Sequence, residues 1–475
     1  MKMKKIVKTV ALATLLAAFG SVKAQEVSPV DFMLMNPYQM KANPAADLPY
    51  NSVMSLIVGN VGLNIQGTGV RYDNLFDFDA QGRPAALNLG KFADGLRVDN
   101  SLCFSANENL FTLYRRLPVG MLTFGYDVRF QGDMSFNDDL FVLLAKGNAA
   151  FVGEDNPVDV SMGLNATAYQ QFAVGYQMNI GRRLSVGARA KLLFGFANVN
   201  TEAFEVKMVT DPASYALRLY ENIAMRASLP SFFTLSDGKL VTAGNLAVSD
   251  LFSNPGFAVD LGAEFHVTNQ IGVVAAVQDL GFFSWKSNNF QLVGNVNDAG
   301  SMYDDGSFLF EGIEINRLQR IVSDEYYREL FLDTLQRYFQ LEVTPAERYS
   351  TMLNTNVLLR GYYDFTPENR VSVQAHGSFR NGGFSPAFTL AYSGSFFEML
   401  DVCATYTLMK GSYTNFGLGL AGNFGTFHVY LATNNLIGAF APFNSDGINV
   451  QGGIVFNMRA PDNRVGSHSP GYLRY

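Results

Sequence analysis

Residues 169–196 read YQQFAVGYQMNIGRRLSVGARAKLLFGF, and this stretch decides the fold. Apolar residues alternate with polar or small ones on both sides of Gly181-Arg182-Arg183. Because side chains on a strand point to opposite faces with period two, the pattern predicts a hairpin with one apolar face. Each arm has about 9–11 residues, the length of a tilted strand that crosses a bilayer. A soluble sandwich also gives such a pattern, but the hairpin recurs through most of the chain, which favours a membrane barrel.

The composition agrees with a barrel. Of 475 residues, 48% are hydrophobic and 13% aromatic. Charged residues make up only 16%, below the roughly 25% that is usual in soluble domains. After the N-terminal region no run of about 18 apolar residues occurs, so no membrane-spanning helix is expected. These features favour an outer-membrane barrel over a cytosolic enzyme.

The N-terminus predicts export. Four lysines precede an almost wholly apolar stretch from Val10 to Phe19, and Val22-Lys23-Ala24 has the small-residue pattern of a cleavage site. We therefore interpret residues 1–24 as a cleaved signal peptide of a protein bound for the outer membrane. Its removal takes away five lysines and no acid, so the formal net charge changes from −7 to −7 − 5 = −12. Such an acidic chain is a poor partner for nucleic acid.

The remaining chain divides into three parts. Residues 25–50 are rich in Pro and Asn and lack a period, which predicts an irregular periplasmic segment or a plug folded into the barrel. Residues 51–458 form the predicted barrel, in which 62–107 read mostly as loop. Residues 459–475 read as a polar periplasmic tail.

The strand count is about 14, an even number, as bacterial single-chain barrels require. Short turns alternate with longer connections, and the longest are predicted outer loops at 131–167, 198–255 and 279–354. Three helices are expected in these extracellular insertions. One is capped by Asn137 or Asp138 and ends at Gly147, one follows Asp211-Pro212 and includes Tyr215, Leu219 and Ile223, and one carries an apolar stripe over residues 327–339.

If the apolar faces contact lipid, the opposite faces line the lumen. The predicted lumen residues that carry charge, or titrate, are Asp127, Arg129, Arg189, Lys191, Asp260, Glu264, Arg360, Asp364, His376 and Arg380. They form either a polar conduit or ligand site, or a ladder of ion pairs that fills the barrel. The ladder is the favoured interpretation, because interior charges must be paired whatever the function. Arg189 and Lys191 are expected to lie on a strand next to Asp260 and Glu264.

Motifs for catalysis are lacking. The four histidines stand singly, with no metal-ligand spacing, and there is no nucleophile elbow or phosphate-binding loop. We therefore expect no enzyme, no metal and no cofactor. Cys103 and Cys403 are 300 positions apart; a disulfide is open to them, but two unpaired small residues are favoured.

Four motifs carry a resemblance. They are Asn165–Tyr169, Gly195–Val199, Gln278–Phe282 with Trp285, and Gly452–Phe456. In their order and spacing the chain resembles an uncharacterised outer-membrane barrel family of Bacteroidota, a domain of unknown function. Through Asn43-Pro44-Ala45 it is also similar to FadL-like transporters of hydrophobic compounds, which have 14 strands and an N-terminal plug, and to PorP/SprF-like barrels of type IX secretion and gliding. The long insertion at 279–354 departs from both groups, so no residue role is carried over.

Two functions follow as expectations. One is a channel or transporter for small molecules, hydrophobic ligands included, in a shell of outer-membrane lipid. The alternative is a structural barrel that anchors a secretion or surface complex. That barrel would bind a periplasmic or surface protein through residues 459–475 or the helix near 327–339.

Overall fold

The fold is that of a computed structural model, which describes residues 27–48, 52–67, 72–294, Tyr326 and 342–459. Short gaps interrupt these ranges at 82–83, 149–150, 214–216, 237–238, 381–382, 398, 410–411, 442–444 and 446. The predicted signal peptide, the predicted tail from residue 460 and the whole of the predicted helix at 327–339 lie outside the described residues.

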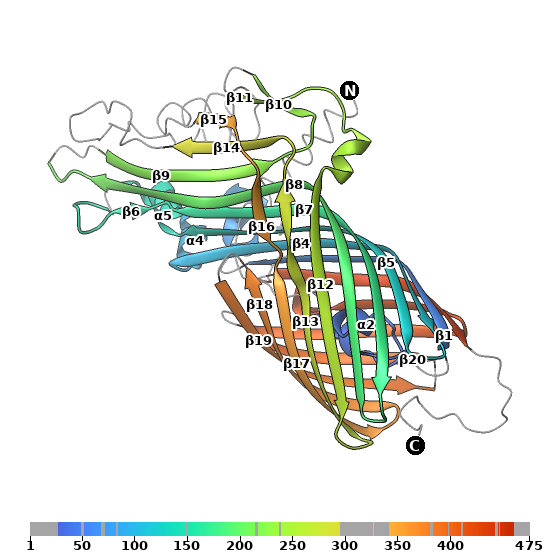
Figure 1. The fold of residues 1–475 in the computed structure, drawn as a ribbon. Coiled ribbons are helices and arrows are strands. Elements are labelled where there is room, and N and C mark those ends of the chain that lie inside the picture. The colour runs from blue at the N-terminus through green and yellow to red at the C-terminus, as the bar shows by residue number, and fades with distance from the viewer. Residues whose placement is uncertain are drawn as a thin grey trace.

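Fourteen of the described strands form one closed antiparallel barrel (Figure 1). The ring closes because β1 pairs with β23 on one side and with β4 on the other. In ring order the strands are β1 (Ser52–Gly67), β4 (Asp99–Arg116), β5 (Met121–Asn137), β7 (Met162–Ile180), β8 (Leu184–Thr210), β12 (Asn254–His266), β13 (Ile271–Trp285), β17 (Thr355–Thr366), β18 (Asn369–Arg380), β19 (Gly383–Phe396), β20 (Leu400–Met409), β21 (Ser412–Phe424), β22 (Phe427–Thr433) and β23 (Gly447–Arg459). The predicted fold class and strand number are confirmed.

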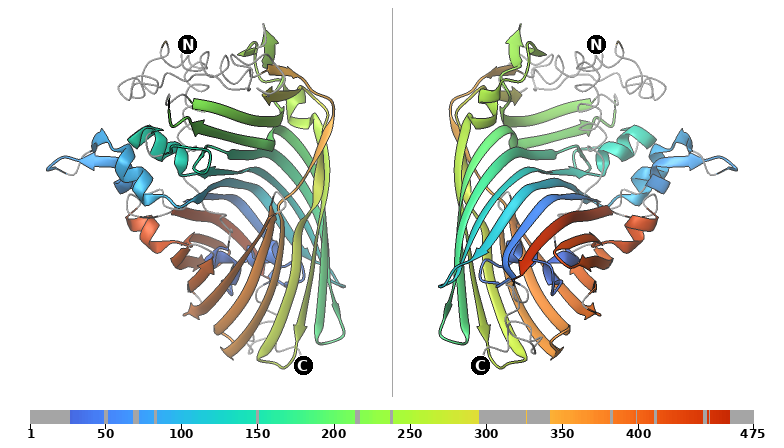
Figure 2. Two further views of the ribbon diagram at one scale, coloured as in Figure 1. Left: turned by 90° about the vertical axis from the view of Figure 1, so that its left-hand side faces the viewer. Right: turned by 90° about the vertical axis from the view of Figure 1, so that its right-hand side faces the viewer.

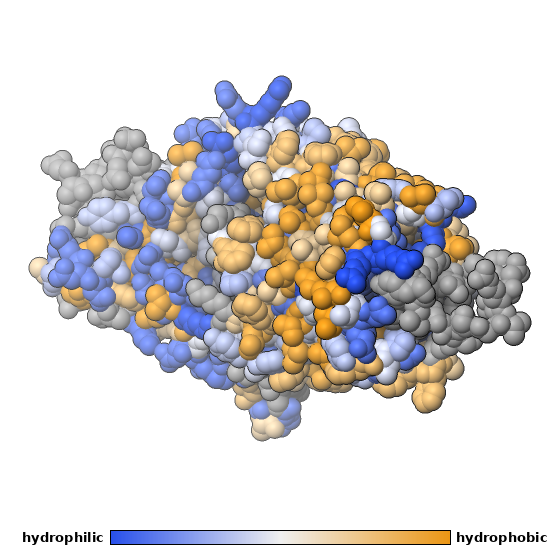
Figure 3. Space-filling model, turned by 60° about the horizontal axis from the view of Figure 1, so that its bottom comes forward, coloured by the Kyte–Doolittle hydropathy of each residue, from blue (hydrophilic) through white to orange (hydrophobic). Residues whose placement is uncertain are grey.

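The outer surface of the barrel is apolar. On β7 the predicted lipid-facing residues Val174 and Ile180 are 52% and 50% exposed, whereas Gln177 between them is buried. Figure 3 shows side chains of this kind gathered over the barrel wall. A contiguous apolar surface of this size suits a bilayer rather than water. Among the helices in the described residues, none has the length and hydropathy needed to cross a membrane.

The barrel has two unlike ends. The short turns, such as those at 181–183 and 267–270, gather at the lower end in Figure 1, which we call the short-turn end. At the opposite, long-loop end, β5, β7 and β8 continue beyond the barrel and are joined by extra strands (Figure 2). These strands are β6 (Val158–Asp159), β9 (Leu217–Ser228), β14 (Asn289–Gly294), β15 (Glu342–Pro345) and β16 (Tyr349–Met352), with a separate hairpin of β10 (Phe233–Ser236) and β11 (Lys239–Thr242).

Strands therefore reach into the predicted loops. The sheet continues to Asn137 on β5 and to Thr210 on β8, and much of the region 62–107 is strand rather than loop. The helix predicted after Asp211-Pro212 is wrong, because Leu217–Ser228 is β9 and pairs with β8 over its whole length. The open edge of β8 offers main-chain partners that the local helical spacing does not take into account.

A small lobe lies beside the long-loop end. It contains α3 (Tyr72–Leu75), β2 (Phe76–Phe78), β3 (Pro84–Leu87), α4 (Leu89–Gly95) and α5 (Asp139–Lys146). The predicted helix is confirmed as α5, with Asp138 at its N-cap and Gly147 after its end at φ 74°. Phe92 of α4 packs edge-on against Phe141 of α5, with ring centroids 4.9 Å apart. Two shorter helices lie elsewhere at this end: η3 (Val248–Phe252) and α8 (Leu436–Phe440).

Residues 27–48 lie inside the barrel, in the half nearer the short turns (Figures 1 and 2). They contain two single-turn helices, η1 (Pro29–Phe32) and α2 (Gln39–Ala42). Ser28 caps η1 by accepting a hydrogen bond from the main-chain N–H of Val30, and Pro29 supplies the preformed first position. Val30, Met33 and Met40 are almost fully buried against the inner wall. We call residues 27–48 the inner segment.

Candidate functional site

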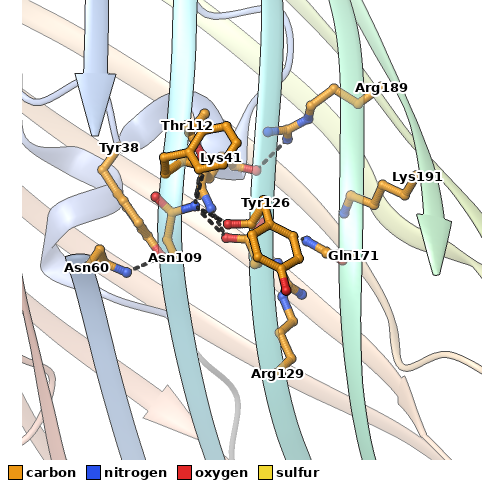
Figure 4. Close-up of polar contacts among 12 residues, drawn as sticks. Tyr38, Lys41, Asn60, Asn109, Thr112, Tyr126, Arg129, Gln171, Arg189 and Lys191 are labelled. Atoms are coloured by element: carbon orange, nitrogen blue, oxygen red, sulfur yellow. Dashed lines mark hydrogen bonds and ion pairs between the residues drawn. The ribbon is translucent and has the colours of Figure 1, made fainter. Parts of the chain in front are cut away.

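The lumen contains a cluster of charged side chains around the end of α2. Lys41 extends from the inner segment to the carboxylate of Asp127 on β5 (Figure 4). Asp127 also accepts hydrogen bonds from the amides of Asn109, at 2.7 Å, and Gln171, at 2.9 Å. The main-chain oxygen of Lys41 accepts a hydrogen bond from Arg189 at 2.6 Å. The inner segment is therefore attached to the wall through both the side chain and the main chain of Lys41.

Two cations of β8 share one carboxylate of β12. Arg189 and Asp260 are direct cross-strand partners, and their Nε and Oδ2 atoms are 3.1 Å apart. Lys191 Nζ lies 2.7 Å from Asp260 Oδ1. All three side chains are nearly completely buried, at 7%, 5% and 1% exposure. The predicted pairing of the strands is confirmed, and the buried charges compensate one another as burial requires.

Asp279 completes the cluster, although the sequence interpretation placed it at the start of a loop. A bulge between Val259 and Leu261 shifts the register, and Asp279 adopts φ 56°, a left-handed conformation that Asp tolerates. Its carboxylate then lies 2.6 Å from Lys191 and 3.1 Å from Arg129. Four cations (Lys41, Arg129, Arg189, Lys191) thus face three anions (Asp127, Asp260, Asp279), which gives 4 − 3 = +1. The cluster encloses a cavity of about 20 Å³, enough for one water molecule.

Three other predicted lumen residues lie in separate contacts near the short-turn end. Glu264 lies on the strand next to Arg189 and Lys191, as predicted, but it accepts hydrogen bonds from Asn43 of the inner segment, at 3.0 Å, and from Tyr362, at 2.8 Å. The cross-strand partner of Glu264 is Ser185, which lies four residues before Arg189 on β8.

Arg360 and Asp364 lie on β17. Arg360 donates to the main-chain oxygen of Asp31 at 2.9 Å, and its guanidinium stacks over the ring of Phe32, 4.1 Å from the centroid. Asp364 forms a two-pronged ion pair with Arg370, at 2.6 and 3.0 Å. Arg360 is therefore a further attachment of the inner segment, whereas Asp364 is paired within the wall.

His376 and Arg380 lie farther along β18, towards the long-loop end. His376 Nδ1 has no hydrogen-bond partner among the described residues, and Arg380 donates to Ser378 at 3.2 Å. Neither joins the cluster around Lys41.

Cys103 and Cys403 are both buried, and no disulfide joins them, which agrees with the interpretation favoured from the sequence.

Other attachments of the inner segment involve residues that the sequence did not single out. The main-chain N–H of Met35 donates to Asp401 at 3.1 Å, and Ser393 donates to the oxygen of Phe32 at 2.7 Å. At its far end Asp47 pairs with Arg116 at 2.8 Å. In the sequence these wall residues are recognisable only as inward positions of alternating strands. Which of the inward positions contact the inner segment depends on where the segment lies in the folded barrel, and the local sequence does not determine that.

Two glycines form the seat of the turn at Asn43-Pro44-Ala45. Gly187 and Gly262 are cross-strand partners on β8 and β12. A Cβ atom on Gly262 would lie 2.8 Å from Asn43 Oδ1 and 2.9 Å from Pro44 Cδ, closer than side chains approach. Only glycine lets the inner segment pack so near the wall at this point.

A large cavity lies across the mouth of the barrel at the long-loop end. Its volume is about 830 Å³, within the range of small-molecule sites. Its lining includes Ser101, Ser135 and Ser161 on one side, and Ser385 and Met409 of β19 and β20 on the opposite side of the ring. Among the described residues, no group of three or more His, Cys, Asp or Glu side chains is placed to hold a metal ion.

The model of the family described as "Family of unknown function (DUF5723)" matches residues 44–434. No curated protein matches the sequence. The toluene transporter TbuX of Ralstonia pickettii is similar in structure, with 9% identity, coverage of 90% of this chain and 95% of that chain, and a TM-score of 0.42. A FadL homologue of Pseudomonas aeruginosa has 12% identity, coverage of 93% and 96%, and a TM-score of 0.40.

Proposed function

The chain belongs to the DUF5723 family, whose function is unknown, and we propose that it is an outer-membrane transport barrel for small molecules, closed at rest by its inner segment. The observation that carries the proposal is the order of features along the lumen. An 830 Å³ cavity opens at the long-loop end, polar side chains continue from it, and the inner segment fills the other half.

The apolar wall supports placement in a membrane. Its outward rings also form a row at the long-loop side, where Tyr126 stacks on Phe172 at 4.6 Å and Phe194 contacts Phe252 of η3 at 5.3 Å. Aromatic rows of this kind mark the boundary between the hydrocarbon and the headgroups. In such barrels the short turns face the periplasm and the long loops face outward, so substrate would enter at the large cavity.

The attachment of the inner segment supports a removable closure. None of its described residues belongs to the barrel sheet, and its polar links to the wall are hydrogen bonds and ion pairs of side chains, such as those of Lys41 and Asp47. A typical hydrogen bond contributes about 0.5–1.5 kcal/mol net. Displacement of the segment therefore breaks side-chain contacts with the wall but leaves the sheet intact, because every strand of the barrel remains paired on both sides.

Conductance of the purified protein in planar bilayers tests the proposal. The wild-type barrel should conduct little, and deletion of residues 27–48 should produce a stable open pore. Gly361→Ala is the matched control, because a Cβ atom at Gly361 meets nothing within 4 Å. Folding of each variant is checked by heat-dependent mobility on gels. A folded deletion variant that conducts no more than wild type would contradict a lumen closed by the segment.

A further inference from the structure

The lumen between the mouth and the charged cluster is lined by hydroxyl and carboxamide side chains. Two inward rows cross β4, β5, β7 and β8 in register. The deeper row is Ser105, Gln131, Thr167 and Asn198, and the row nearer the mouth is Cys103, Asp133, Asn165 and Asn200. Ser101 and Ser135 follow as the next cross-strand pair, at the edge of the large cavity. One wall of the path is thus almost wholly hydrogen-bonding.

A second, small cavity of about 30 Å³ lies along these rows. Gln131, Asp133, Asn165, Thr167 and Asn198 are among its lining residues. The side chains already bond one another: Asn198 donates to Thr167 at 2.9 Å, and Tyr349 donates to Asn198 at 2.8 Å. The hydroxyl groups of a polyol can replace such hydrogen bonds with their own. An apolar solute would displace water from these polar side chains without forming hydrogen bonds to them, which costs free energy.

Three polar atoms on this path lack a hydrogen-bond partner among the described residues. They are Ser105 Oγ in the deeper row, and Asn137 Oδ1 and Ser385 Oγ on opposite sides of the large cavity. Buried polar atoms are normally satisfied, so these positions have capacity for a partner from outside the chain.

The charges on the path disfavour anions. Arg97, Asp99 and Asp159 line the large cavity, and Asp133 lines the small one, which gives 1 − 3 = −2. The cations that follow, from Arg129 inward, are each paired with an aspartate of the cluster, whose net charge is only +1. The fixed charges that line the two cavities are therefore mostly negative, and polar groups form one wall of the path, although Phe136, Phe204 and Phe384 add apolar surface to the large cavity.

We infer that the solute is an uncharged, multiply hydroxylated molecule of the saccharide class, held at the mouth cavity and along the two polar rows. The inference rests on the proposed transport function but replaces the hydrophobic ligand expected from the sequence. It assigns Gln131, Asn165, Thr167 and Asn198 as residues that bind a hydroxyl group of the solute, because the small cavity that they line has room for only one or two water molecules.

The chain contains a single tryptophan, Trp285, and its fluorescence can be used to detect binding at the small cavity. Trp285 Nε1 donates to Thr351 at 2.8 Å, and its ring lies 5.1 Å from that of Phe283. Thr351 and Phe283 both line the small cavity. Binding there should change the emission of Trp285.

The full-length protein in lipid nanodiscs is titrated with maltose as the hydroxylated probe and with toluene as the apolar one. Equilibrium dialysis gives the affinity, and Trp285 emission gives the location. We expect saturable maltose binding with a change in emission, and no saturable toluene signal above that of empty nanodiscs. Thr167→Val and Asn165→Leu should each weaken maltose binding about three- to tenfold, the effect of one or two lost hydrogen bonds. Ser372→Ala, a buried hydroxyl on β18 away from both cavities, should leave it unchanged.

Saturable toluene binding without maltose binding would overturn the inference, as would maltose binding that Thr167→Val and Ser372→Ala affect equally. Binding of neither probe would overturn it as well. Thr167→Val is nearly isosteric, so it provides the comparison if Asn165→Leu does not fold. The outcome is separate from the conductance test, because a barrel that binds maltose yet never conducts would refute transport alone.

Discussion

Gly187 and Gly262 face each other across β8 and β12, and together they leave the space into which Pro44 of the inner segment fits. Asn43 shapes the turn there, because its Oδ1 accepts a hydrogen bond from the N–H of Ala45 at 3.0 Å. Its Nδ2 donates to Glu264. The wall and the inner segment are therefore complementary in shape at the point where the segment bends.

Substitution of Gly262 tests this complementarity. Gly262→Ala should push Pro44 away from the wall and destabilise the folded protein by about 1–3 kcal/mol, as overpacking does. Labelling of a cysteine placed at Ala46, which is 8% exposed, should become faster with a bulky maleimide. Gly361→Ala carries the same chemical change on β17 and should alter neither quantity. Equal labelling rates in the Gly262→Ala and Gly361→Ala variants would show that the packing of Pro44 does not require glycine at position 262.

Asp260 should contribute more to stability than any exposed ion pair. Asp260→Asn leaves Arg189 and Lys191 buried with one fewer anion, and loss of one partner of a buried pair costs about 3–5 kcal/mol. Asp94→Asn is the control, because Asp94 and Lys146 are 68% and 51% exposed and such pairs contribute about 0–1 kcal/mol. Urea unfolding in lipid vesicles measures both. Similar midpoints for the two variants would mean that solvent or Asp279 compensates the cations.

Alternation predicts the barrel strands well but not where they end. Within the bilayer one face must be apolar, so Val174 and Ile180 alternate with polar residues and the strand is visible in the sequence. Beyond the bilayer both faces meet water or other chain segments, and the period is lost while main-chain pairing continues. This is why β8 extends to Thr210 and why residues 217–228 form β9 and not the predicted helix.

The lumen residues likewise could be predicted from the sequence only where a local pattern determines their position. Arg189, Lys191 and Asp260 could be placed from alternation and from the order of the hairpins, because both are local properties. Lys41 could not, since its pairing with Asp127 depends on how the inner segment lies in the barrel, a contact across 86 positions. Asp279 was missed because a bulge and a left-handed residue break the period at that point.

Lys41 should control how firmly the inner segment is held. Lys41→Met keeps the length of the side chain but removes the ion pair with Asp127, which retains its bonds to Asn109 and Gln171. We expect brief openings in bilayer recordings at least several times more frequent than in wild type. Arg116→Gln, at the more exposed pair with Asp47, should have a smaller effect. If Arg116→Gln increased the frequency of openings more than Lys41→Met, the pair of Asp47 with Arg116 would be the main attachment of the inner segment.

The lobe around α5 should respond to pH through Asp138. Burial raises the pKa of Asp138, and the neighbouring carboxylate of Asp139 raises it further. A carboxyl group whose pKa is higher in the folded state stabilises that state below its unfolded pKa, and this contribution is lost as the pH rises through the folded value. Because the side chain is partly exposed, the effect is a few tenths of a kcal/mol. Protection of the α5 amides against hydrogen exchange, corrected for the intrinsic rate, should therefore be higher at pH 4 than at pH 7. Asp138→Asn keeps a good N-cap residue and should remove that difference. If both proteins show the same pH trend, another group in the lobe is responsible.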